Sequence, residues 1–112
     1  AYCKKDPISG LVAEIREKEV ISDDPMNDEM IIGSFWFKNS FDFIDSAENT
    51  IKNDLTVNGE HYIGNSLNYL IKKGKKIKKF EIKKWVSFGD PFELEVHNYW
   101  EDYFYQNPNI NY

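Results

Sequence analysis

Residues 10–19 read Gly-Leu-Val-Ala-Glu-Ile-Arg-Glu-Lys-Glu, and this stretch decides the fold that the sequence predicts. Over residues 11–16, Leu, Ala and Ile alternate with Val, Glu and Arg, which is the two-residue period of a β-strand. Turn-forming Asp, Pro, Ser and Gly precede it at residues 6–10, and residues 1–5 also have the pattern of a strand. We therefore expect an antiparallel hairpin made of residues 1–5 and 11–16.

Two apolar stretches farther along the chain predict additional strands. After a polar loop at residues 21–28, residues 30–37 are apolar at both odd and even positions, as in a strand that is covered on both faces. Gly33 lies inside this stretch, and an interior glycine marks a bulge or the close approach of a ligand or another backbone. Residues 77–82 predict an edge strand, because lysines flank them.

Apolar spacing of three to four residues predicts two helices between these strands. The first begins at a cap formed by Asn39 or Ser40 and runs to about residue 53. The second follows the Asn58-Gly59 turn and stops at Gly74. The predicted apolar faces consist of Phe41, Ile44, Ala47, Ile51 and Leu55 in the first helix, and of Tyr62, Ile63, Ser66, Leu67, Leu70 and Ile71 in the second.

A third helix has the clearest predicted start. Asp90 can cap it, Pro91 suits the first helical position, and Glu93 follows the cap by three residues, as in a capping box. Strands and helices mix without strict alternation, so the predicted fold class is mixed α/β, with short strands and three helices. We expect the third helix to bury a stripe made of Phe92, Val96, Tyr99, Trp100 and Tyr103.

Length and composition limit the class of protein. A chain of 112 residues has room for one domain, so we expect residues 1–112 to form a single unit. Its 41% hydrophobic content exceeds what a wholly disordered chain has, and its apolar runs are too short to span a bilayer. One cysteine, Cys3, cannot form an internal disulfide, so we expect a cytoplasmic protein without a membrane partner.

Charge bears on nucleic-acid binding. The net charge of -5 argues against a surface that binds phosphate backbone throughout. Residues 72–84 nevertheless contain eight lysines, with Phe80 and Trp85 nearby, and could form a nucleic-acid strip whose affinity would fall steeply with salt. A solvated helix end and edge strand explain the lysines more simply, so we expect no nucleic-acid partner.

Two polar stretches could bind a ligand. Glu17, Lys18 and Glu19 follow the end of a predicted strand. There the lysine ammonium can contact a phosphate, and a carboxylate can accept hydrogen bonds from hydroxyl groups. A solvated surface triplet is the simpler interpretation. Residues 58–63 join a turn to a helix start, where backbone amides favour anions; a plain Asn-Gly turn is the alternative. His61 and the chain's other histidine lack partners at metal-ligand spacing, so a zinc site is not expected.

Four motifs in this order carry a resemblance. Residues 10–19, 33–37, 57–63 and 88–91, the last followed by Leu94, are similar to the C-terminal half of the sugar-1-phosphate nucleotidyltransferases of the glucose-1-phosphate thymidylyltransferase type. The Val-Asn-Gly-Glu sequence resembles the branch of this family that serves capsule or surface-sugar pathways. The resemblance covers roughly residues 1 to 95.

The resemblance implies a Rossmann-like nucleotidyltransferase fold and an activity. A sugar phosphate oxygen attacks the α-phosphorus of a nucleoside triphosphate (NTP), pyrophosphate leaves, and Mg²⁺ assists. The resemblance implies that Glu17 accepts hydrogen bonds from the sugar hydroxyls and that Lys18 contacts the sugar phosphate. It also implies that Ile31 and Gly33 line the sugar pocket through their backbone. Asn58 and Glu60 would hold the far side of that pocket.

The sequence departs from the family in two ways. Ser87 stands where a magnesium-binding Asp is expected, and a hydroxyl is a poorer ligand than a carboxylate. The family's glycine-rich nucleotide loop and its first metal-binding Asp belong to an N-terminal half that these residues do not include, so we expect no turnover by this chain alone. A non-catalytic sugar-phosphate-binding or protein-interaction module is the alternative, and a homo-oligomer, the choice of NTP and the choice of acceptor stay open.

Overall fold

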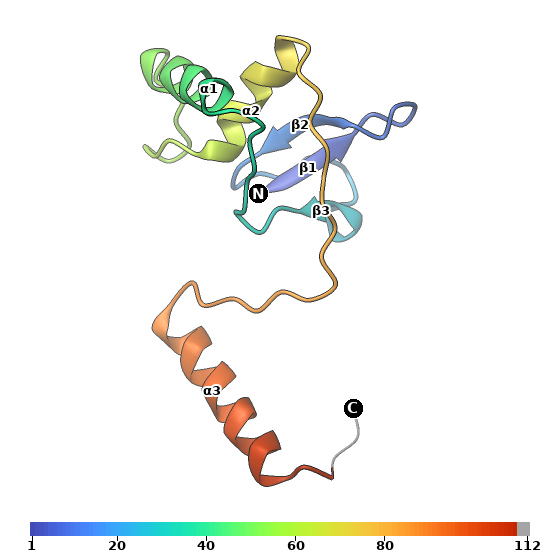
Figure 1. Ribbon diagram of the computed structural model, residues 1–112, viewed down its shortest axis with the longest axis vertical. Coiled ribbons are helices and arrows are strands. Elements are labelled where there is room, and N and C mark those ends of the chain that lie inside the picture. The colour runs from blue at the N-terminus through green and yellow to red at the C-terminus, as the bar shows by residue number, and fades with distance from the viewer. Residues whose placement is uncertain (110–112) are drawn as a thin grey trace. The chain divides into compact units, whose positions relative to one another are not determined.

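A computed structural model describes residues 1–109 (Figure 1). The chain divides into two compact units, Ala1–Phe80 and Glu81–Tyr112. The first unit contains a small sheet and two helices, and the second contains one helix. The predicted mixed α/β class is therefore confirmed, with a three-stranded antiparallel sheet and three helices.

The predicted hairpin forms the centre of the sheet. β1 (Tyr2–Lys5) pairs antiparallel with β2 (Val12–Arg16), with Tyr2 opposite Arg16. The short β3 (Glu29–Met30) pairs with the other side of β1, so the strand order is β2-β1-β3. Each outer strand therefore has one edge that β1 does not cover.

The three helices lie where the sequence predicts them. They are α1 (Ser40–Lys52), α2 (Ile63–Lys72) and α3 (Pro91–Gln106). Asn39 caps α1 by accepting from the backbone N–H of Asp42 at 2.9 Å, which settles the predicted choice between Asn39 and Ser40. Asp90 caps α3 in the same way.

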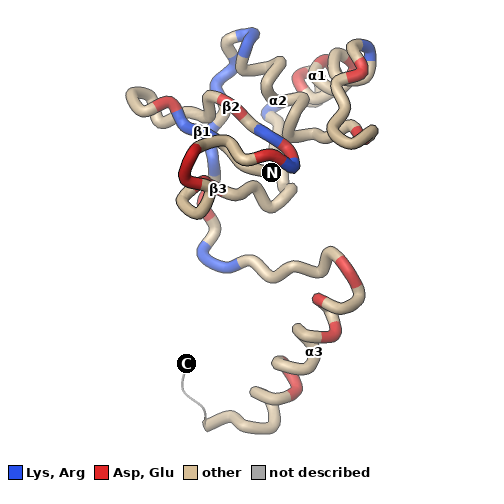
Figure 2. The backbone as a smooth tube through the Cα atoms, turned by 180° about the vertical axis from the view of Figure 1, so that it is seen from behind, with Lys and Arg blue, Asp and Glu red and all other residues tan. Residues whose placement is uncertain are grey.

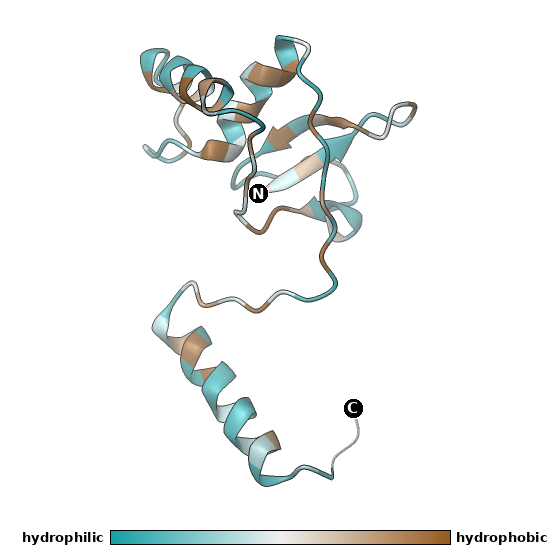
Figure 3. Cartoon of the chain, in the orientation of Figure 1, coloured by the Kyte–Doolittle hydropathy of each residue, from teal (hydrophilic) through white to brown (hydrophobic). Residues whose placement is uncertain are grey.

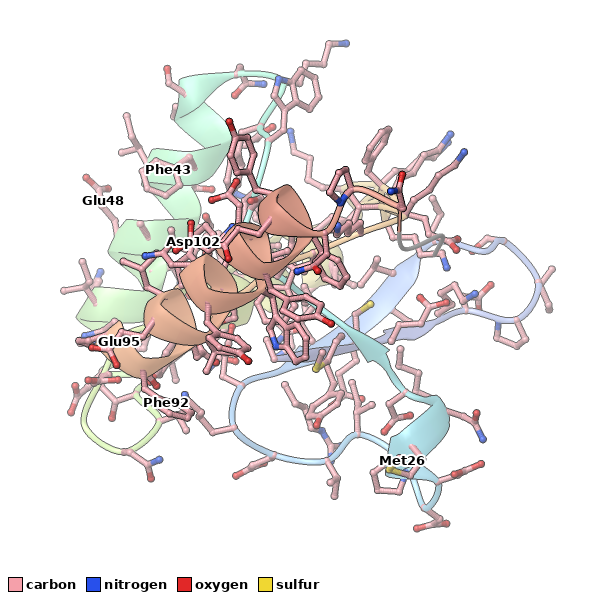
Figure 4. All side chains as sticks on the ribbon, turned by 90° about the horizontal axis from the view of Figure 1, so that it is seen from below. Met26, Phe43, Glu48, Phe92, Glu95 and Asp102 are labelled. Carbon is pink, nitrogen blue, oxygen red and sulfur yellow. The ribbon has the colours of Figure 1, made fainter. Side chains whose placement is uncertain are left out.

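A short 3₁₀ helix, η1 (Pro25–Asn27), lies within the predicted polar loop. Pro25 occupies its first turn, where the missing N–H of proline has no bond to lose. Met26, labelled in Figure 4, projects from it, and its side chain is 92% exposed. Within residues 21–28 only Ile21, at the start of the loop, is buried, at 6% exposed.

The side chain of Asn68 fastens α2 to the sheet. Its Oδ1 accepts from the backbone N–H of Ile15 at 2.9 Å, and its Nδ2 donates to the carbonyl of Ile15 at 2.8 Å. On the same edge of β2, the N–H of Val12 donates to the carbonyl of Ile77 at 2.9 Å. The core beneath α2 is formed by Cys3, Val12, Ile15, Leu67 and Leu70.

Hydroxyl groups line the contact between α1 and α2. Ser46 is fully buried, and Thr50 and Ser66 are each 2% exposed. Ser46 donates to the carbonyl of Phe43, and Thr50 donates to the carbonyl of Ser46, so these buried hydroxyls are satisfied within α1. Small side chains let the two helices approach closely, because they occupy little volume at the contact.

The apolar face that the sequence predicts for α1 is not its buried face. Ser46 and Thr50 are the buried residues of α1, and Phe43, labelled in Figure 4, is 38% exposed. In α2, by contrast, Ser66, Leu67 and Leu70 of the predicted face are buried. The large residues of the predicted face that stay exposed are Phe41, Ile44 and Ile51 of α1 and Leu55, three residues beyond its end.

The predicted strand over residues 30–37 was wrong beyond its first residue. Its ladder consists of Glu29 and Met30, after which the N–H of Ile31 donates to the carbonyl of Ala1 at 3.0 Å. Beyond that bond no further ladder bond to β1 forms within the described residues. Gly33 then adopts a φ of +83°, which breaks the extended path.

The predicted strand over residues 77–82 does not form either. Ile77 makes one backbone bond to Val12, and no strand follows in this stretch. A ladder along β2 would need the backbone groups of Ile15, and the side chain of Asn68 occupies both. Figure 3 shows hydrophobic residues along this extended segment.

No residue of α3 is buried. The predicted stripe is exposed, with Phe92 at 70% and Trp100 at 49%, so the prediction of a buried stripe was wrong for the described residues. The aromatic rings pack on one another instead, since Trp100 stacks on Phe104 with centroids 5.9 Å apart. Its charged side chains are all acidic (Figure 2): Glu93, Glu95, Glu101 and Asp102.

Replacing Asn68 by alanine tests the attachment of α2. Asn68→Ala leaves the N–H and carbonyl of Ile15 without their partners, so we expect the free energy of unfolding to fall by about 2 kcal/mol. Urea denaturation followed by circular dichroism measures the change. The control Asn65→Ala, in the same helix, should change it by less than about 0.5 kcal/mol. Equal losses in the two variants would contradict this role.

Candidate functional site

A cavity of about 450 Å³ lies where three parts of the first unit meet. We call it the Glu17 cavity. Its walls come from the residue after β2, from the segment after β3 and from the start of α2. The lining residues are Ala1, Glu17, Ile31, Ile32, Gly33, Phe35, His61, Tyr62, Ile63 and Gly64.

Glu17 is the buried acidic residue of this cavity. It directly follows β2 and is 8% exposed, which is unusual for a carboxylate. Its Oε2 lies 3.8 Å from the amino nitrogen of Ala1. A carboxylate so placed presents acceptors, so the cavity can receive hydroxyl or N–H groups of a ligand.

Lys18 turns the chain at the end of β2. Its φ is +59°, a left-handed conformation that costs a residue with a Cβ about 1–2 kcal/mol. Lys18 is exposed and is not among the residues that line the cavity. Strain of this kind persists where the surrounding structure imposes it, and it is common at binding sites.

Asn58 and Gly59 form a tight two-residue turn. Their φ values are +52° and +78°, and both backbone bonds between Val57 and Glu60 close the turn, as in a type I′ hairpin. Asn58 is exposed and does not line the Glu17 cavity. Its position fits the alternative of an ordinary Asn-Gly turn.

Glu60 adjoins the cavity through Tyr62. The hydroxyl of Tyr62 donates to Oε2 of Glu60, and Tyr62 lines the cavity. This hydrogen bond raises the pKa of Tyr62, with smaller contributions from burial and from the charges of Glu60 and Glu17. The tyrosine is therefore held protonated, with its phenol oriented by the carboxylate.

The structure brings together some of the residues that the sequence indicated. Glu17, Ile31 and Gly33 line one cavity, although residues 17 and 33 are separated by a loop. Lys18 and Asn58 are not among the residues that line this cavity.

Sequence reasoning did not assign several lining residues to the site. Phe35, His61, Tyr62 and Gly64 belong to the cavity, and the first three lie within or beside motifs that the sequence analysis quoted. The sequence does mark Gly64, because a glycine inside the first turn of a helix lowers helix propensity. Its presence there therefore needs an explanation other than helix formation.

The described residues do not fit a magnesium site. Ser87 donates its hydroxyl to Oε2 of Glu93, and that oxygen also accepts from the N–H of Gly89 at 2.8 Å. Within residues 1–109, no group of three or more His, Cys, Asp or Glu side chains could hold a metal ion. We therefore derive no step through a metal bound by these residues.

Lysines of residues 72–84 form ion pairs in the first unit. Nζ of Lys73 lies 2.7 Å from Asp45, and Nζ of Lys75 lies 2.9 Å from Asp42. The hydrogen bond to Asp45 raises the pKa of Lys73. Lys79 pairs with Glu29, so Lys73, Lys75 and Lys79 all have carboxylate partners within the first unit.

Comparison with known proteins gives no further constraint. No family model, curated protein or solved structure matches this chain. Among residues 1–109, none of the helices combines the length and the apolar character that crossing a membrane requires. The function is therefore argued from the Glu17 cavity and its chemistry.

The pair formed by Tyr62 and Glu60 can be tested by titration. Glu60→Gln replaces the charged acceptor of the Tyr62 hydrogen bond, the main cause of the raised pKa, by a neutral amide, so we expect the pKa of Tyr62 to fall toward its ordinary value of about 10. NMR of ¹³C-labelled tyrosine follows the ring carbon that bears the hydroxyl. Glu48→Gln, at an exposed position of α1 labelled in Figure 4, is the control and should leave this pKa unchanged. An unaltered titration in Glu60→Gln would contradict the pairing.

Proposed function

We propose that this chain is the acceptor-binding part of a nucleotidyltransferase that uses a sugar phosphate or a related phosphate. One observation carries the proposal: Glu17, Ile31 and Gly33, which the resemblance assigns to the acceptor site, line a single cavity. Its volume of about 450 Å³ suits a small ligand.

The chemistry of the cavity supports an acceptor with hydroxyl groups and a phosphate. The carboxylate of Glu17 would accept hydrogen bonds from hydroxyl groups. Lys18 is the next residue and carries an exposed ammonium, which would contact the phosphate as a point charge. Residues 31–33 line the cavity outside any strand, so their backbone could contact the ligand.

The proposed reaction needs residues that this chain does not contain. An oxygen of the sugar phosphate would form a bond to the α-phosphorus of an NTP, and the bond from that phosphorus to pyrophosphate would break. The residues described here would bind and orient the acceptor. An N-terminal half would bind the NTP and supply carboxylate ligands for Mg²⁺, as the resemblance implies.

Two apolar segments support the idea that a further segment completes the sheet. Residues 31–37 and 77–82 have sequences typical of strands, yet they have almost no backbone ladder within the described chain. In the proposed Rossmann-like fold, neighbouring strands from the N-terminal half would pair with these segments. Pairing would also cover side chains such as Trp36, which is 84% exposed here.

Lys18→Gly tests ligand binding by Lys18 without a large change in the stability of the fold. Glycine adopts the left-handed conformation without the cost that lysine incurs, so we expect the free energy of unfolding to stay within about 1 kcal/mol of wild type. Loss of the ammonium should weaken the binding of glucose 1-phosphate, the probe, at least about 10-fold. NMR titration of the isolated chain measures the affinity. Lys38→Ala, at another exposed lysine, should bind as wild type does; unchanged affinity in Lys18→Gly would contradict the assignment.

Turnover tests the complete proposal. An N-terminal half of a nucleotidyltransferase of the proposed kind is co-expressed with this chain, and pyrophosphate release is assayed with a panel of NTPs and sugar phosphates. We expect release with one pair of substrates and its loss, by about 10²-fold or more, in the double variant Glu17→Ala, Lys18→Ala. Absence of turnover with every pair, or full activity of the double variant, would refute the proposal.

A non-catalytic binding or interaction module is the second candidate. The hydrogen bond from Ser87 to Glu93 favours it, because the hydroxyl at the position where the family is expected to have a metal-binding Asp is bound to the first turn of α3. This candidate predicts that glucose 1-phosphate stabilises the chain against heating while no substrate pair gives turnover. Binding together with turnover would exclude it.

A further inference from the structure

Gly64 is the second residue of α2, and its backbone does not require glycine. Its φ lies outside the left-handed region, unlike the φ values of Gly33, Gly59 and Gly74. Alanine would favour the helix at this position, because glycine lowers helix propensity. Another constraint must therefore account for the missing side chain.

The carboxylate of Glu17 occupies the space in which a side chain at position 64 would lie. A Cβ on Gly64 would overlap Oε1 of Glu17 and would lie 3.2 Å from its Cδ and 3.3 Å from Cγ2 of Ile15. Real Cβ atoms do not approach other atoms as closely as that overlap requires, so one group has to move. The carboxylate is the group that moves, because it is the end of a flexible side chain.

At the other glycines of the first unit, no side chain occupies the space that a Cβ would take. A Cβ at Gly10, Gly33, Gly59 or Gly74 would meet no atom within 4 Å. At Gly64 the neighbour is a buried carboxylate, and both residues line the same cavity. The choice of glycine at position 64 thus follows from the placement of Glu17.

We propose that Gly64 is a positioning residue: its missing Cβ leaves the space that holds the carboxylate of Glu17 in the cavity. Gly64 itself offers no side chain to a ligand. It acts through Glu17, by letting the carboxylate lie against the first turn of α2, where the helix dipole favours a negative charge. The consequence for ligand affinity rests on the proposed function, whereas the consequence for Glu17 does not.

Gly64→Ala should displace the carboxylate without unfolding the chain. Alanine stabilises the helix while the contact with Glu17 opposes it, so we expect the Tm to stay within about 5 °C of wild type. The ¹³C resonance of the Glu17 carboxyl group reports its surroundings and should shift. Affinity for glucose 1-phosphate should fall at least about 10-fold, as expected for a lost hydrogen bond to a charged group.

Shortening the acidic side chain provides a rescue. Glu17→Asp withdraws the carboxylate by one methylene group, which makes room for a Cβ at position 64. Glu17→Asp alone should weaken glucose 1-phosphate binding. The double variant Gly64→Ala, Glu17→Asp should bind better than Gly64→Ala alone, and a general defect in α2 would not produce that recovery.

Gly89→Ala is the matched control for the shift of the Glu17 carboxyl resonance. A Cβ there would also meet a glutamate, at 3.1 Å from Oε2 of Glu93, but Gly89 does not line the Glu17 cavity. The Glu17 resonance should be unaltered in this variant.

The outcomes separate the two proposals. A shifted Glu17 resonance in Gly64→Ala, with binding lost and then partly regained in the double variant, supports both. An unshifted resonance, or a double variant no better than Gly64→Ala where wild type binds, refutes the positioning role. A shifted resonance with no binding by any variant, wild type included, supports the positioning role and refutes the proposed function.

Discussion

One side-chain amide fixes the arrangement on which the Glu17 cavity depends. Asn68 holds both backbone groups of Ile15 and thereby sets the register of α2 against β2. Gly64 lies four residues before Asn68, about 6 Å along the helix, and Glu17 lies two residues after Ile15, about 6.6 Å along the strand direction. These two lengths nearly match, so the bond at Ile15 also brings Glu17 against Gly64.

Local structure, which depends on residues close to one another in the sequence, was predictable from the sequence. The hairpin follows from alternation and turn residues, and the caps at Asn39 and Asp90 follow from side chains that reach a backbone N–H three residues on. The strand predictions at 30–37 and 77–82 failed because a strand needs a backbone neighbour. The sequence pattern shows the tendency but not whether a partner is present. Ile77 makes one backbone bond to Val12, and the amide of Asn68 occupies the backbone groups of Ile15 that a longer ladder along β2 would need.

The site was predictable in part, for a related reason. Glu17, Ile31 and Gly33 could be named from motif positions, and the structure places them around one cavity. Gly64 stands out in the sequence only as a glycine at the start of a helix, and its contact with Glu17 exists only once α2 docks on β2. The burial of Ser46 was missed as well, since apolar spacing finds the hydrophobic face of a helix and not a close contact made of hydroxyl groups.

The bonds along the outer side of β2 have a consequence for self-association. Edge strands act as templates on which strands of other molecules polymerise, because they present unpaired N–H and carbonyl groups. Asn68 and Ile77 occupy such groups on β2. The other edge strand, β3, spans two residues, which is too short to template a stable ladder. These bonds and the shortness of β3 leave few backbone groups at the edges of this small sheet for another strand to pair with, although many apolar side chains around it are exposed.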